Sequence, residues 1–185
     1  MKLYKSVLPA FILLIVIGSV CRVAGFAPQI AMAVFGAAVI RDRRLAFVLP
    51  LLSNFLCDVL YEVLFRLGYM DYGGFYEGQI TNYILLALIV VIGFWARNLK
   101  WTSILMASIA APTIYFFLSN FLVWFGGGGL QRPKTFDGLL MCYNDAIPFF
   151  RSGLITTMVF SFVLFGSYFL VQRYILQPRI SAVRS

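Results

Sequence analysis

The chain has 185 residues, of which 62% are hydrophobic and only 12% are charged, and its formal net charge is +8. A mean hydropathy of +0.90 excludes an ordinary soluble domain and favours a single all-α transmembrane domain over residues 1–185. The basic residues lie in short clusters between apolar runs, which is typical of membrane topology signals rather than of a nucleic-acid-binding patch. The sequence has no histidine, the commonest transition-metal ligand and general base, so we expect no metal site and no cofactor.

Two apolar runs open the chain. Lys2 and Lys5 begin the first, and its length over residues 4–21 predicts an uncleaved membrane span, with a cleaved signal peptide as the alternative. Pro28 suits the first turn of a second helix over residues 28–40, which is short for a span. Ala33 and Ala37 within it have the four-residue spacing of small residues that lets two helices pack closely.

A basic cluster and a third span follow. Arg41, Arg43 and Arg44 are typical of a cytoplasmic anchor. The next run, residues 45–65, is long enough to cross a bilayer at 1.5 Å per residue. It nevertheless contains polar side chains spaced by four, which form one stripe on a helix: Asn54, Asp58, Glu62 and, just beyond, Arg66. Such a stripe turns away from lipid and predicts either a ligand or ion site or a packing stripe with neutralised carboxylates.

The second half of the chain predicts three more spans. A loop rich in Gly and Tyr leads to spans over residues 80–96 and 101–124, the latter with Pro112 as a kink. Residues 125–153 are too polar to cross the bilayer and too apolar for a linker, so we expect an extracytoplasmic capping loop that folds back onto the protein. Residues 154–174 form the sixth predicted span, ahead of a basic tail.

Charge decides the expected orientation. With six spans, ten Lys and Arg lie on the side of the two termini and five on the other side. The positive-inside rule then predicts both termini in the cytoplasm of a multi-pass bacterial inner-membrane protein. The polar stripe and the two longest loops consequently fall on the outer face.

Short motifs give little support to an enzyme. The run GGGGLQRPKT only partly fits a phosphate-binding loop, because Pro133 stands where a glycine is required and has no backbone N–H to offer. Asp58 and Glu62 could share one helix face, but no nucleophile, metal motif or paired-cysteine signature accompanies them. A disulfide between Cys21 and Cys142 is left open. We therefore expect a protein that is not an enzyme.

Three blocks of the sequence resemble a known family. They are residues 22–58, beginning RVAGFAPQIAMAVFGAAVIRDRR, residues 74–83 (GFYEGQITNY) and residues 124–135 (WFGGGGLQRPKT). These resemble a family of uncharacterised bacterial six-span inner-membrane proteins regarded as transport proteins, which is itself similar to the substrate-binding S components of energy-coupling-factor (ECF) vitamin transporters. That resemblance implies six helices, cytoplasmic termini, an outward-facing pocket and docking to a membrane coupling subunit with its ATPases. The Ala-xxx-Ala docking pattern of the first S-component helix falls in the second helix here, at Ala33 and Ala37.

The sequence thus predicts a subunit that captures a small, vitamin-like solute from the extracytoplasmic side for uptake. Aromatic side chains would stack on a ring, and amides and carboxylates would orient it. The candidate substrate-binding residues are Gln29, Asn54, Asp58, Glu62, Tyr76, Gln79, Asn82, Tyr83, Asn120 and Trp124, and the candidate partner-docking residues are Ala33, Ala37, Arg41, Arg43 and Arg44. The alternative is a non-transporting accessory or structural subunit of a larger bacterial envelope complex.

Overall fold

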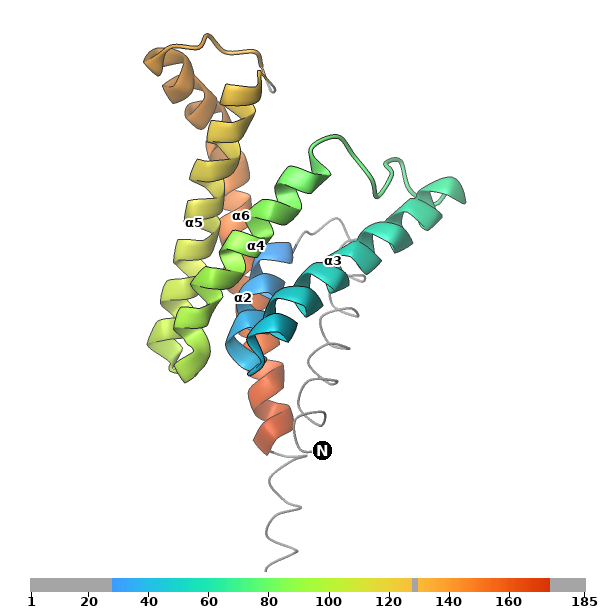
Figure 1. Ribbon diagram of the computed structural model, residues 1–185, viewed down its shortest axis with the longest axis vertical. Coiled ribbons are helices and arrows are strands. Elements are labelled where there is room, and N and C mark those ends of the chain that lie inside the picture. Colours follow the sequence, from blue (N-terminus) through green and yellow to red (C-terminus); the bar gives the residue numbers. More distant parts are fainter. Residues whose placement is uncertain (1–27, 128–129, 174–185) are drawn as a thin grey trace, which may run out of the picture.

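The computed structural model describes residues 28–127 and 130–173, and these ranges contain helices and no strand (Figure 1). The elements are α2 (Gln29–Val39), α3 (Arg43–Arg66), α4 (Gln79–Gly93), the 3₁₀ helix η1 (Phe94–Asn98), α5 (Trp101–Gly126) and α6 (Phe136–Val171). The expected all-α fold class is therefore confirmed for this part of the chain.

Four helical segments in the described ranges are long and apolar enough to cross a membrane: α3, α4 continued by η1, α5 and α6. Only α2 falls short, because 11 residues span about 17 Å and a bilayer core is about 30 Å thick. The predicted span at residues 4–21 lies outside the described residues. The chain thus has the helices of a membrane protein, while the six-span count and the orientation of the termini stay predictions.

The short helix α2 is the centre of the fold (Figure 1), and every residue from Ala31 to Ala38 on it is buried. Two glycines bring neighbouring helices against it: a Cβ on Gly93 of α4 would lie 2.6 Å from Ala37 Cβ, and a Cβ on Gly36 would lie 2.4 Å from Pro50 Cγ of α3. The predicted close packing of small residues is confirmed. Ala33 and Ala37 are at most 2% exposed and pack in the core of their own chain, and their predicted docking role stays a prediction.

Polar contacts fix the basic end of this core. Asp42 caps α3, where its Oδ1 accepts hydrogen bonds from the backbone N–H of Arg44 (2.8 Å) and Leu45 (3.2 Å). Arg97 of η1 donates to the backbone oxygens of Ala37 and Ile40, both at 3.1 Å, and so satisfies carbonyls at the C-terminal end of α2. Arg97 is therefore a structural cap on α2.

The sixth predicted span begins too late. Helix α6 starts at Phe136 rather than at residue 154 and runs for 36 residues, so most of the predicted capping loop is helical. Thr135 supplies the N-cap through a 3.2 Å bond from Gly138 N–H, and Pro148 is accommodated inside the helix. A helix of 36 residues is longer than a bilayer requires. The polar residues that argued against a span lie in its first half, in the stretch that exceeds that length. That stretch packs on the end of α5 (Figure 1), where Tyr143 Oη donates to Phe117 O at 3.0 Å.

Candidate functional site

A buried carboxylate joins α3 to α4 in the half of the molecule away from the basic end of the core. Asp58, only 1% exposed, accepts a 2.8 Å hydrogen bond from Gln79 Nε2 and a second bond from Tyr83 Oη on its Oδ2 atom. Gln79 Nε2 also lies 3.1 Å from Tyr83 Oη. The four-residue spacing of Gln79 and Tyr83 puts both side chains on the face of α4 that meets the polar stripe of α3. Three of the predicted site residues are thereby brought together.

A second polar chain continues from the same turns of α4. Asn82 Nδ2 donates to Tyr76 Oη at 2.8 Å, and Tyr115 Oη of α5 donates to Asn82 Oδ1 at 2.6 Å. Because Asn82 uses both ends of its amide, it holds the loop before α4 and the middle of α5 in one register. The hydrogen bonds therefore extend laterally from α4 to α5.

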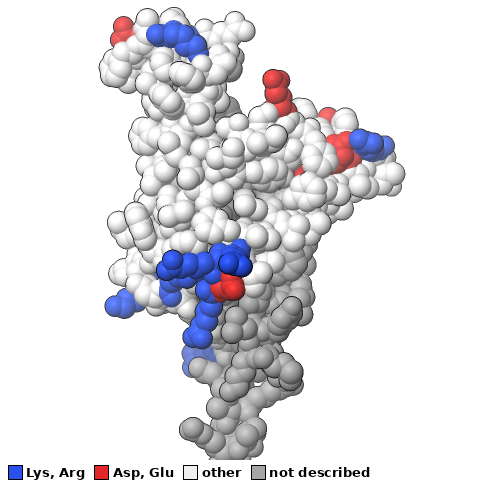
Figure 2. Space-filling model, in the orientation of Figure 1, with Lys and Arg blue, Asp and Glu red and all other residues white. Residues whose placement is uncertain are grey.

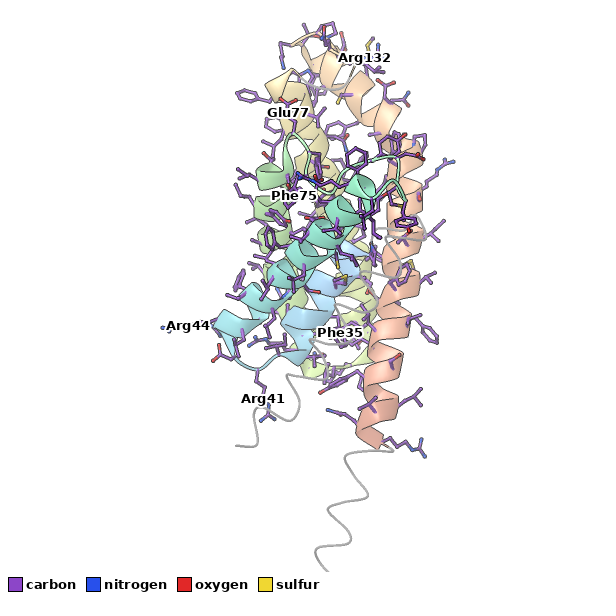
Figure 3. All side chains as sticks on the ribbon, turned by 90° about the vertical axis from the view of Figure 1, so that its right-hand side faces the viewer. Phe35, Arg41, Arg44, Phe75, Glu77 and Arg132 are labelled. Atoms are coloured by element: carbon purple, nitrogen blue, oxygen red, sulfur yellow. The ribbon has the colours of Figure 1, made fainter. Side chains whose placement is uncertain are left out.

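The loop between α3 and α4 lies directly on α3. Glu62 Oε1 pairs with Arg66 Nε at 2.8 Å, while its Oε2 accepts a 3.0 Å bond from Gly74 N–H. A Cβ on Gly74 would lie 1.8 Å from Asp58 O, so only glycine permits this approach. Glu62 thus anchors the loop, and Figure 3 shows Phe75 on this loop, near the end of α3.

A cavity of about 260 Å³ lies between α5, α6 and the start of α2. Rings supply much of its lining, together with the two amides Gln29 and Asn120 and the hydroxyl of Ser119; the rings are Tyr115, Phe116, Phe149 and Phe150. The Asn120 Nδ2 atom donates to Phe116 O at 2.8 Å within its own helix. Tyr115 therefore belongs both to the cavity wall and to the hydrogen-bonded chain that leads to Asn82.

The ten predicted site residues consequently separate into groups. Gln29 and Asn120 line the cavity. One set of polar contacts joins Asp58 to Gln79 and Tyr83, and another joins Asn82 to Tyr76. Glu62 belongs to the loop anchor. Asn54 is buried at 3% exposure on α3, and its Nδ2 has no hydrogen-bond partner among the described residues. Trp124 lies apart, with its indole N–H 2.8 Å from Pro133 O.

Sequence reasoning missed most of the cavity. Pro112, Phe116 and Asn120 are spaced by four and share one face of α5, and Tyr115 and Ser119 repeat the same spacing beside them. That spacing could have identified the α5 wall of the cavity. The residues are mostly apolar, however, so the same pattern is typical of ordinary helix packing. Phe149 and Phe150 were expected in a loop, so their place on a helix facing α5 was not anticipated.

Charged side chains lie in three places in Figure 2: a mostly basic cluster in the lower part, and mixed charges near the top and on the right. Arg41 and Arg44 lie at one end and Glu77 and Arg132 at the other (Figure 3). At the second end, Arg132 Nη2 lies 2.8 Å from Asp145 Oδ2, and this hydrogen bond and the carboxylate charge raise the pKa of the guanidinium. The cavity and the polar contacts lie between these ends.

A scan against protein families places residues 2–180 in a family of unknown function, DUF6580, so the chain belongs to that family. The expectation of an uncharacterised family is thereby confirmed, without any link to ECF S components. No curated protein and no solved structure matches the chain.

Proposed function

We propose that this member of DUF6580 is a substrate-capturing membrane subunit that binds a small, vitamin-like solute from the extracytoplasmic side of a bacterial inner membrane for uptake. The observation that carries the proposal is the cavity of about 260 Å³ whose wall residue Tyr115 is bonded to Asn82. Concave sites lined by rings with a few placed polar groups are the usual form of small-molecule sites.

Charge supports the proposed orientation. The basic cluster of Arg41, Arg43 and Arg44 lies at the opposite end of the molecule from the loop that contains Glu77 (Figures 2 and 3). Under the positive-inside rule the basic end is cytoplasmic, and the loops near the polar contacts face outward. A reporter fused at Gly127 should then be extracytoplasmic, and one fused at Ser185 cytoplasmic; the reverse result would contradict this orientation.

The resemblance of the sequence blocks to proteins similar to ECF S components suggests a mode of action, which we propose here. Those proteins capture a substrate and depend on a coupling subunit and ATPases for transport. The printed sequence has no ATPase motif, so uptake by this protein would draw its energy from partner subunits. Ala33 and Ala37 are buried, while Arg41, Arg43 and Arg44 are accessible to a partner.

The test is whether the protein carries a solute. We would purify it in mild detergent from native membranes and identify any bound small molecule by mass spectrometry after denaturation. The proposal expects one molecule that recurs between preparations and that is released stoichiometrically. Stoichiometric co-purification with a larger envelope complex, with no small molecule, would instead favour the accessory-subunit alternative.

A further inference from the structure

The chemical character of the cavity wall restricts what it can hold. The four rings, two amides and one hydroxyl named above make up most of the wall, and none of the described residues that line it carries a charge. Asp58 and Glu62, the acidic residues of the stripe, do not line it. A charged ligand would therefore lose its hydration without gaining an opposite charge on these walls.

The depth of the cavity adds to this cost. Its α5 wall runs from Pro112 to Asn120, away from both ends of the apolar helix Trp101–Gly126. If α5 crosses the bilayer, the Pro112 end of this stretch lies in the hydrocarbon layer, where ionised groups are strongly disfavoured. Phe149 and Gly153 face it from the part of α6 nearer the membrane surface. The apolar surroundings do not penalise an uncharged ligand in this way.

The wall also indicates shape and hydrogen bonding. Phe116 and Phe150 have ring centroids 4.7 Å apart with a 37° tilt, so these two rings pack against each other. Together with Tyr115 and Phe149 they give the cavity an aromatic lining that suits a flat ring. Asn120 Nδ2 donates one of its two N–H groups to Phe116 O, and the amide Oδ1 is an acceptor that a donor on the solute can meet. A volume of about 260 Å³ is below the range of drug-sized sites and suits one or two rings.

We infer that the solute of the proposed function is an uncharged, flat molecule of one or two rings with a hydrogen-bond donor on its edge. This inference rests on the proposed function and adds the substrate class. The carboxylates Asp58 and Glu62, which we expected to orient the ligand, lie outside the cavity wall and have no part in this inference. Asp58 then joins α3 to α4 through Gln79 and Tyr83 and does not contact the solute.

Three probes of matched shape test the charge requirement: 2-naphthamide, which is neutral, 2-naphthoate, which is an anion, and 2-naphthamidinium, which is a cation. Binding to the purified protein would be measured by calorimetry or by competition with the retained molecule. We expect 2-naphthamide to bind and each ion to bind at least about 50-fold more weakly, because neither finds a counter-charge.

A charge placed in the wall should reverse this preference. Asn120→Asp should improve binding of 2-naphthamidinium relative to 2-naphthamide, with Ser119→Asp as a second variant if the first does not fold. Asn144→Asp is the control, because Asn144 is exposed and does not line the cavity; it should leave the order of the probes unchanged.

The outcomes separate the two proposals. A retained natural molecule that is ionised at neutral pH, or equal binding of an ion and the amide, would overturn the inference and leave solute capture intact. Failure of the protein to retain any molecule, together with no binding of any probe, would overturn solute capture and this inference with it.

Discussion

The two halves of this molecule are built from similarly apolar helices but are held together in different ways. Around α2, small residues let backbones touch: a Cβ on Gly93 would meet Val34 Cα at 2.9 Å. In the other half, polar side chains such as Asn82 and Tyr115 bridge the helices, and a cavity remains beside them. Backbone contact leaves no room for a ligand, whereas side-chain bridges leave both space and hydrogen-bonding groups.

The largest expected effect comes from disrupting the tight packing around α2. Gly93→Ala adds a Cβ 2.6 Å from Ala37 Cβ, so the helices must shift, and we expect a loss of about 1–3 kcal/mol in unfolding free energy. Gly166→Ala on α6 is the control, because its Cβ meets nothing within 4 Å and alanine favours helix by up to about 1 kcal/mol. Melting temperature in detergent would measure both, and an unchanged or higher value for Gly93→Ala would contradict the packing argument.

A smaller effect is expected when the cap on α2 is removed. Arg97→Ala deletes the two 3.1 Å bonds to Ala37 O and Ile40 O. Because Arg97 is partly exposed, water can replace part of these bonds, and we expect a loss of about 1–2 kcal/mol in unfolding free energy. The exposed neighbour Lys100 provides the control, and Lys100→Ala should change the melting temperature little. Equal melting temperatures for the two variants would contradict the capping role of Arg97.

The smallest effect on stability belongs to the polar half. Tyr115→Phe removes one hydroxyl and its 2.6 Å bond to Asn82 Oδ1, which should cost about 0.5–1.5 kcal/mol. Tyr143→Phe removes a comparable 3.0 Å bond to Phe117 O, but Tyr143 does not line the cavity. The two variants should melt alike, and only Tyr115→Phe should lower the amount of retained solute. Equal solute retention by the two variants would show that the hydrogen bond between Tyr115 and Asn82 does not contribute to binding.

Most helices could be predicted from the sequence because their apolar runs are long and are bounded by charged or polar residues. The start of α6 could not, since residues 136–153 mix polar and apolar side chains and include Pro148, which usually ends a helix. Only the contact with α5 explains why that stretch is helical. The structure was also needed to show that Ala33 is buried in the core of its own chain.

The candidate site was predictable only in part. The four-residue spacing of Asn54, Asp58 and Glu62 identified a polar stripe that turns inward, and the structure buries Asn54 and Asp58. Spacing within one helix does not reveal which side chain of another helix will meet it. The partners Gln79 and Tyr83 were named as site residues without their contact to Asp58, and the aromatic wall on α5 and α6 was missed.

The most direct measurement of solute capture compares two glycines of α6. A Cβ would meet nothing within 4 Å at either Gly153 or Gly166, but only Gly153 lines the cavity. Small molecules released from wild type, Gly153→Leu and Gly166→Leu would be quantified per mole of folded protein by mass spectrometry. We expect Gly153→Leu to lose the solute while Gly166→Leu retains it at the wild-type level. Full retention by Gly153→Leu would contradict binding in this cavity.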